Sequence, residues 1–70
     1  MSNIQNMLEY TKTILQKVSL SQYLFSRELG KSLQWLRKDE ILALQAWCLI
    51  TFGDTYLNII QDIFRNVNLS

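Results

Sequence analysis

The sequence predicts an all-α protein, a single compact domain of residues 1–70. Four short helices are expected to form an irregular or partly orthogonal bundle with the third helix at its centre. Apolar residues recur at the three- and four-residue spacing of a helix, the chain has no proline and only two glycines, and capping residues divide it into four segments. A fold of three helices, in which the first two segments merge through Ser19, is the alternative.

The first helix is expected over residues 3–18. Ser2 followed by Gln5 matches a capping box, in which the serine oxygen accepts a hydrogen bond from the backbone and the glutamine side chain reaches back. The residues of the expected buried face fall within an arc of about 120° on the helical wheel. They are Ile4, Met7, Leu8, Thr11, Ile14, Leu15 and Val18. The pattern indicates an amphipathic helix.

The second helix is expected to start after a break near Ser19 and to run to about Arg37. Ser19 with Gln22 offers a second capping box, and Ser21 is an alternative start. The expected core stripe covers about 80° of the wheel. It consists of Phe25, Leu29, Leu33 and Leu36. Gly30 lies off this stripe, so it is either a tolerated cost of about 1 kcal/mol relative to alanine or a point where another helix approaches closely.

The third helix is expected at Glu40–Phe52, with Asp39 as its N-cap. Apart from Gln45 and Thr51 it is apolar on all sides, which is typical of a helix surrounded by others. We therefore expect Trp47 to lie in the core. The segment is too short to cross a bilayer, which takes about 20 residues.

The fourth helix is expected at about Thr55–Val67. Gly53 followed by Asp54 is typical of a tight corner, in which a glycine ends one helix and an aspartate caps the next. The apolar residues of this segment share one wide face. They are Tyr56, Leu57, Ile59, Ile60, Ile63, Phe64 and Val67.

The residue types argue against an enzyme. No histidine is present, so there is no Ser-His or Cys-His pair, and the single Cys48 can form neither an internal disulfide nor a structural zinc site. Cys48 lies in the most apolar segment, where burial would raise the pKa of its thiol and leave it inert. We expect no catalytic residue, no cofactor, no metal and no small-molecule ligand. Without a recognisable secretion signal, we expect a cytoplasmic protein.

The leading functional hypothesis is a non-enzymatic protein–protein interaction or regulatory module, either with another protein or as a homodimer. On the wheel of the second helix, Leu20, Leu24 and Trp35 form a second apolar face, well away from the core stripe. Lys31 and Lys38 border it, as the polar rim borders a protein interface. The competing interpretation is that the first helix or the C-terminal tail covers this face.

A weak nucleic-acid-binding regulator is the alternative function. Arg27, Lys31 and Lys38 line one strip of the second helix, with Arg37 beside its end, and such a strip could follow phosphates. The net charge of +1 provides no general attraction to nucleic acid or to an anionic membrane. Since Glu28 borders the strip, an ordinary solvated face explains it more simply.

Overall fold

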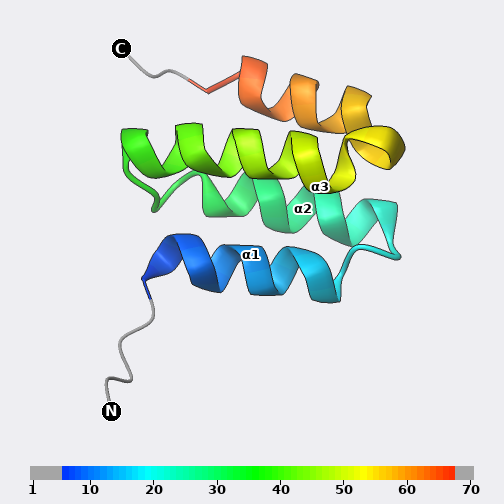
Figure 1. The fold of residues 1–70 in the computed structure, drawn as a ribbon, viewed down its shortest axis with the longest axis horizontal. Coiled ribbons are helices and arrows are strands. Elements are labelled where there is room, and N and C mark those ends of the chain that lie inside the picture. Colours follow the sequence, from blue (N-terminus) through cyan, green and yellow to red (C-terminus); the bar gives the residue numbers. More distant parts are fainter. Residues whose placement is uncertain (1–5, 68–70) are drawn as a thin grey trace.

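Three helices make up the part of the chain that the computed structural model describes, residues 6–67. They are α1 (Met7–Lys17), α2 (Gln22–Ser32) and α3 (Lys38–Arg65), and no strand occurs among residues 6–67. The prediction of four helices is wrong, because the third and fourth predicted segments are continuous and form one element, α3, which is bent at Tyr56. In Figure 1 the helices lie alongside one another in alternating directions, in place of the partly orthogonal packing expected from the sequence.

Helix α1 begins at a cap that the sequence analysis did not single out. The Asn6 side chain accepts a hydrogen bond from the backbone N–H of Glu9 at 2.8 Å. The predicted capping box of Ser2 and Gln5 lies outside the described residues. Near the end of the helix the Val18 N–H donates to the Ile14 carbonyl at 3.1 Å. The amphipathic face is present, although it is narrower than predicted, with Thr11 and Leu15 as its buried residues.

Helix α2 starts at Ser21, the second of the two predicted starts. The Ser21 hydroxyl accepts from the Leu24 N–H at 3.2 Å, whereas the Ser19 hydroxyl donates back to the Gln16 carbonyl at 3.0 Å. Ser19 thus belongs to the turn after α1. Helices α1 and α2 are therefore separate, so the three-helix alternative has the right number of helices but joins the wrong pair of segments.

Helix α2 ends at Ser32, five residues before the predicted end at Arg37. The Ser32 hydroxyl donates to the Leu29 carbonyl at 2.7 Å, and the N–H groups of Gln34 and Trp35 bond three residues back at 3.2 Å. Bonds of this kind tighten a helix end into a turn. Trp35 consequently lies beyond the helix, and its position on a helical wheel does not apply.

Helix α3 begins with a cap provided by Glu40 instead of the predicted Asp39. The N-cap is Arg37, whose backbone N–H donates to Oε1 of Glu40 at 2.9 Å. Asp39 lies inside the first turn, together with Glu40. Both carboxylates are near the positive end of the helix dipole, which favours negative charge there.

A sharp bend at Tyr56 replaces the predicted corner at Gly53–Asp54. Tyr56 has non-helical dihedral angles of φ −125° and ψ 27°, whereas Gly53 and Asp54 continue the helix. A straight helix of 28 residues would be about 42 Å long, which exceeds the longest molecular extent of 38 Å. Figure 1 shows the last part of α3 running back along the first part. We call residues 57–67 the C-terminal arm.

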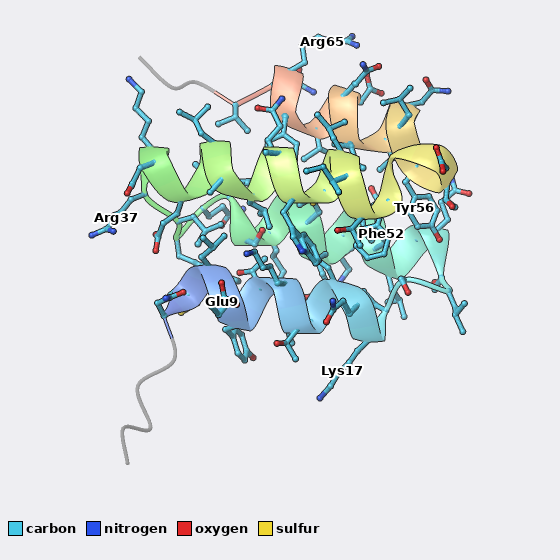
Figure 2. All side chains as sticks on the ribbon, viewed as in Figure 1. Glu9, Lys17, Arg37, Phe52, Tyr56 and Arg65 are labelled. Atoms are coloured by element: carbon cyan, nitrogen blue, oxygen red, sulfur yellow. The ribbon has the colours of Figure 1, made fainter. Side chains whose placement is uncertain are left out.

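Two contacts of Tyr56 hold the bend. Its phenolic O–H donates to the Ser19 carbonyl at 2.6 Å, and its ring stacks on Phe25 with centroids 4.5 Å apart. Phe52 packs edge-on against Phe25 at 5.0 Å. In Figure 2 Phe52 and Tyr56 lie together near the bend, while Lys17, Arg37 and Arg65 project at the edges of the view. An aromatic cluster therefore anchors the point where the chain reverses.

The core lies between all three helices and the C-terminal arm. Its fully buried apolar residues are Leu15, Phe25, Leu29, Leu44, Cys48 and Ile60, with Leu36, Ile41 and Phe64 almost as buried. Trp47, predicted to lie in the core, is only partly buried. Its ring packs edge-on against Phe52 at 5.4 Å, and Nζ of Lys12 lies 5.8 Å from the ring centroid.

The expectation that the segment Glu40–Phe52 is covered on all sides is wrong. Ile50 is 85% exposed, Leu42 48% and Leu49 38%. The side of α3 that carries Leu44 and Cys48 faces the core, and the opposite side is left partly open within residues 6–67. A chain with so few segments cannot surround one of them completely.

Neither glycine marks a close helix approach in the described region. A Cβ atom built on Gly30 or on Gly53 would meet no atom within 4 Å, so the close-approach interpretation of Gly30 is wrong. Gly53 is an interior residue of α3. No helix between residues 6 and 67 has the length and apolar character needed to cross a membrane.

Candidate interaction surfaces

The one thiol of the chain is enclosed by the core. Cys48 has no exposed surface, and burial raises the pKa of its thiol to about 12. The thiol is therefore protonated at neutral pH, and a protonated thiol is a poor nucleophile and a poor metal ligand. Between residues 6 and 67 no group of three or more Cys, Asp or Glu residues is placed to hold a metal ion.

The structure does not bring the three predicted apolar anchors together. Leu20 lies in the turn between α1 and α2 and is fully exposed, while Leu24 lies in the first turn of α2. Trp35 follows the other end of that helix, which is separated from Leu24 by about 12 Å of helix. The expected continuous face fails because α2 ends at Ser32.

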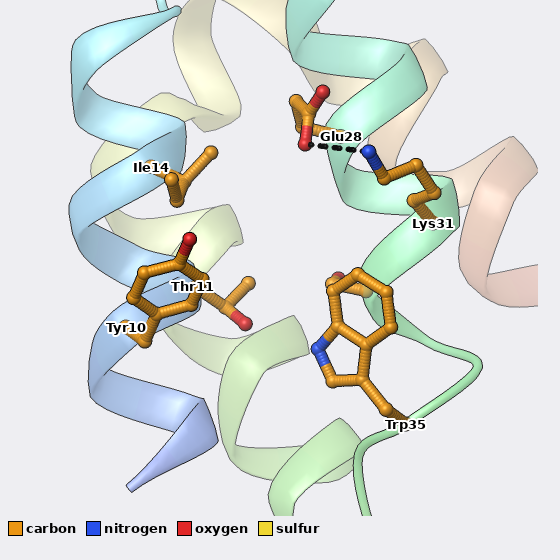
Figure 3. A pocket seen from close by; sticks show the side chains of 7 residues that line it. Tyr10, Thr11, Ile14, Glu28, Lys31 and Trp35 are labelled. Carbon is orange, nitrogen blue, oxygen red and sulfur yellow. Dashed lines mark ion pairs between the residues drawn. The ribbon is translucent and has the colours of Figure 1, made fainter. Parts of the chain in front are cut away.

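Trp35 instead forms one wall of a hollow between α1 and α2. The hollow has a volume of about 90 Å³ and is lined by Tyr10, Thr11, Ile14, Glu28, Lys31, Ser32 and Trp35. Figure 3 shows the Tyr10 ring on the α1 side and the Trp35 ring on the other side, with Glu28 and Lys31 above them. We call it the Tyr10–Trp35 hollow. It unites two of the predicted site residues, Trp35 and Lys31.

Two of the hydroxyl groups that line the hollow donate their protons to their own helices. The Thr11 hydroxyl donates to the Met7 carbonyl at 2.7 Å, and the Ser32 hydroxyl donates to the Leu29 carbonyl at the same distance. Both donors therefore serve their own helices. Ile14 and the aromatic rings of Tyr10 and Trp35 supply the apolar part of the lining, and Figure 3 shows the indole nitrogen of Trp35 facing the hollow.

The rim of the hollow carries an ion pair. Nζ of Lys31 lies 3.6 Å from Oε1 of Glu28, and the other carboxylate oxygen lies 3.7 Å from Nε of Arg27. These groups are partly exposed, so each pair contributes no more than about 1 kcal/mol to stability. In a binding site these groups would orient a polar partner, because the carboxylate offers an acceptor and the two cations offer donors beside the hollow.

The size of the hollow limits what it accepts. A dry cavity of about 150 Å³ holds benzene, so the 90 Å³ here is suited to a smaller group. A branched aliphatic side chain such as that of leucine or valine has a suitable size and polarity. The two aromatic walls would pack against such a group on both sides.

The sequence analysis considered the first helix only as a cover for the face of Trp35; in the structure α1 lies beside Trp35 but leaves it 44% exposed. Ile14 was assigned to the core, and Tyr10 received no role, although the two lie four residues apart and thus on neighbouring turns of one helix face. The four-residue spacing of Tyr10 and Ile14 was the feature of the sequence that could have revealed their shared position. The approach of Trp35 to this face depends on the turn after Ser32, which the periodicity does not reveal.

Carboxylates accompany most of the predicted basic strip. Glu28 pairs with both Arg27 and Lys31, and Arg37 lies 3.5 Å from Asp39. The same Arg37 guanidinium lies 3.8 Å from Glu40. Lys38 forms no ion pair with any residue between 6 and 67. The strip therefore presents little net positive charge to a phosphate backbone, and the geometry gives nucleic-acid binding no support.

A second candidate surface, which sequence reasoning also missed, is the side of α3 opposite the core. We call it the outer face of α3, and it consists of Leu42, Ala43, Ala46, Leu49 and Ile50, all exposed. No charged residue lies between Glu40 and Asp54. Burying a leucine or isoleucine side chain completely gains about 1.5–3 kcal/mol. With exposures of 85%, 48% and 38%, covering the three large side chains would gain roughly 3–5 kcal/mol per chain.

Comparison with known proteins yields no relative of this chain. No family model, no curated protein and no solved structure matches it.

Proposed function

We propose that the protein is a non-enzymatic interaction module that binds a protein partner in the Tyr10–Trp35 hollow. The observation that supports this most is the placement of two half-exposed aromatic rings on opposite sides of an apolar hollow with an ion pair at its rim. Trp35 is 44% exposed and Tyr10 45%. Tryptophan and tyrosine are enriched among the residues that contribute most to protein interfaces.

The partner that fits is a peptide segment with a protruding branched aliphatic side chain. That side chain would enter the hollow and displace water from both aromatic rings, which is the main source of affinity. Lys31 and Glu28 would bind polar groups beside it and set the orientation of the peptide.

The proposed contact is small. A standard interface buries about 800 Å² per partner, and one side chain in one hollow buries much less. We therefore expect micromolar affinity and rapid exchange. Such properties suit a regulatory or adaptor role more than a permanent complex.

Selection of peptides from a random displayed library, followed by calorimetric titration, tests the proposal. We expect the selected peptides to share a leucine, isoleucine or valine and to bind Trp35→Ala at least tenfold more weakly than the wild type. Leu20→Ala is the matched control, because Leu20 is a fully exposed apolar residue that does not line the hollow. Equal binding to Trp35→Ala and to the wild type, with the helical circular dichroism spectrum unchanged, would exclude this site.

A further inference from the structure

Positive charge exceeds negative charge at the rim of the Tyr10–Trp35 hollow. Oε1 of Glu28 lies 3.6 Å from Nζ of Lys31, and Oε2 of Glu28 lies 3.7 Å from Nε of Arg27, so two cations share one carboxylate. Charge-assisted hydrogen bonds are shorter, at about 2.7–2.9 Å, so neither cation is fully engaged. A ligand that complements this rim therefore brings a negatively charged acceptor.

A further donor points into the hollow from its wall. The indole nitrogen of Trp35 faces the hollow in Figure 3, and its N–H donates to no residue between 6 and 67. An indole N–H can only donate. Lys31 and Trp35 thus offer donors to a ligand from the same side of the hollow, since both belong to α2 and the turn that follows it.

The C-terminal residue of a peptide carries the groups that these charges favour. Its carboxylate would balance the excess positive charge of Arg27 and Lys31 over Glu28. Its amide N–H is a neutral donor, which suits the Glu28 oxygens better than a third positive charge beside two cations. The amide nitrogen and the carboxyl carbon of one residue are about 2.5 Å apart. This distance is comparable with the 3.6 Å between Glu28 and Lys31, so the two groups can face their counterparts together.

The size of the hollow also agrees with a chain end. A volume of about 90 Å³ is suited to one aliphatic side chain, which places the Cα of that residue at the mouth, beside Lys31 and Glu28. The carboxylate on this Cα then lies at the rim. An acidic neighbour in an extended peptide would not replace it, because successive side chains point to opposite sides.

We infer that the Tyr10–Trp35 hollow binds the C-terminal residue of its peptide partner, a leucine or valine with a free carboxylate. The carboxylate accepts from Lys31 and from the indole N–H of Trp35, and the amide N–H of the same residue donates to Glu28. This inference rests on the proposed function and restricts it to partners that end in a branched aliphatic residue. Free leucine fits less well, because its ammonium group leaves the excess positive charge in place.

Titrations followed by heteronuclear NMR test the inference with three probes. They are acetyl-Gly-Gly-Leu with a free carboxylate, the same peptide with a C-terminal amide, and acetyl-Gly-Gly-Leu-Gly, in which the carboxylate is one residue farther away. We expect the first to bind about tenfold more tightly than the others, the effect of one charge-assisted hydrogen bond. It should also shift the indole N–H resonance of Trp35, which Trp47→Phe identifies by removing the other indole.

Variants of Lys31 show whether its charge recognises the carboxylate. Lys31→Gln should bind the free acid and the amide equally, and Lys31→Arg should retain most of the preference for the acid. Lys38→Gln is the matched control, because Lys38 is an exposed lysine that does not line the hollow. In the wild type, added salt should weaken binding of the acid and leave binding of the amide unchanged, since only the acid brings a charge. Circular dichroism shows whether each variant is folded.

The outcomes separate this inference from the proposed function. Equal binding of the acid and the amide by the wild type, or a preference for the acid that survives in Lys31→Gln, would overturn recognition of the C-terminus and leave the peptide-binding hollow in place. Tighter binding of free leucine than of acetyl-Gly-Gly-Leu would assign the hollow to a free amino acid instead. If no probe shifts any resonance of the residues that line the hollow, both the inference and the proposed function are wrong.

Discussion

Tyr56→Phe removes one hydrogen bond from the bend in α3 and leaves the aromatic ring in place. In the wild type the phenolic O–H donates to the Ser19 carbonyl at 2.6 Å in a partly buried setting. Such a bond contributes about 1 kcal/mol net, and somewhat more is lost if the carbonyl stays without a donor. Because stability is roughly 0.05–0.15 kcal/mol per residue, the variant should lose a measurable part of the total.

Urea unfolding followed by circular dichroism measures this loss. We expect a lower midpoint with an unchanged slope, since the surface exposed on unfolding is the same. The melting temperature should fall by about 4–8 °C, the shift that 1 kcal/mol produces in a domain of this size. Tyr23→Phe is the matched control, because Tyr23 is highly exposed and its hydroxyl makes no hydrogen bond to another residue between 6 and 67. If both variants unfold at the wild-type midpoint, the Tyr56–Ser19 bond does not stabilise the bend.

Three further predictions concern other sites. Cys48 should resist alkylation by iodoacetamide at pH 8 in the folded protein and react after denaturation in urea; reaction at equal rates in both states would contradict the burial. Because the folded pKa of its thiol, about 12, exceeds the ordinary value of 9.0, the stability of the protein should also decrease as the pH rises from about 9 towards 12. Gly53→Ala should raise the free energy of unfolding, measured by chemical denaturation, by about 0.5–1 kcal/mol, because Gly53 lies in a helix interior and the added Cβ meets no atom within 4 Å. A lower free energy of unfolding would contradict this and indicate that the added Cβ is crowded. Fluorescence anisotropy with labelled oligonucleotides should detect no binding at low salt, because Glu28 pairs with Arg27 and Lys31; tight binding with a salt slope steeper than about −3 would contradict this.

The amphipathic pattern of the first segment predicted α1, because its polar and apolar faces are clearly divided. The cap at Asn6 was missed, although Asn6 followed three residues later by Glu9 carried the signal. The starts of α2 and α3 were each placed within one or two residues, although of the predicted caps only Ser21 takes that role and Asp39 lies inside the first turn of α3. Capping residues in the sequence therefore indicate the region where a helix begins, but not the residue that caps it.

The ends and the surroundings of the helices were less predictable. The apolar periodicity continues through Leu33 and Leu36, yet α2 ends at Ser32 because local turn bonds compete with the helix. Similarly, an apolar stretch such as Ile41–Phe52 indicates that its burial would be favourable. It does not indicate whether a neighbouring segment is available to cover it. Both candidate surfaces depend on where α2 ends and on which side of α3 is covered, and the sequence pattern gives neither. The sequence therefore singled out Trp35 without the hollow that it lines, and it did not reveal the outer face of α3.

The bend at Tyr56 also has a kinetic consequence. Most packing in this fold joins segments that are consecutive in the chain, such as α1 with α2 and the C-terminal arm with the first part of α3, and local contacts of this kind form quickly. The bond between Tyr56 and Ser19 is different, since it closes a loop of 37 residues. We expect this contact to form after the main folding barrier. Its removal should then accelerate unfolding and leave the folding rate almost unchanged, so that the bend determines how long the native state lasts rather than how fast it is reached.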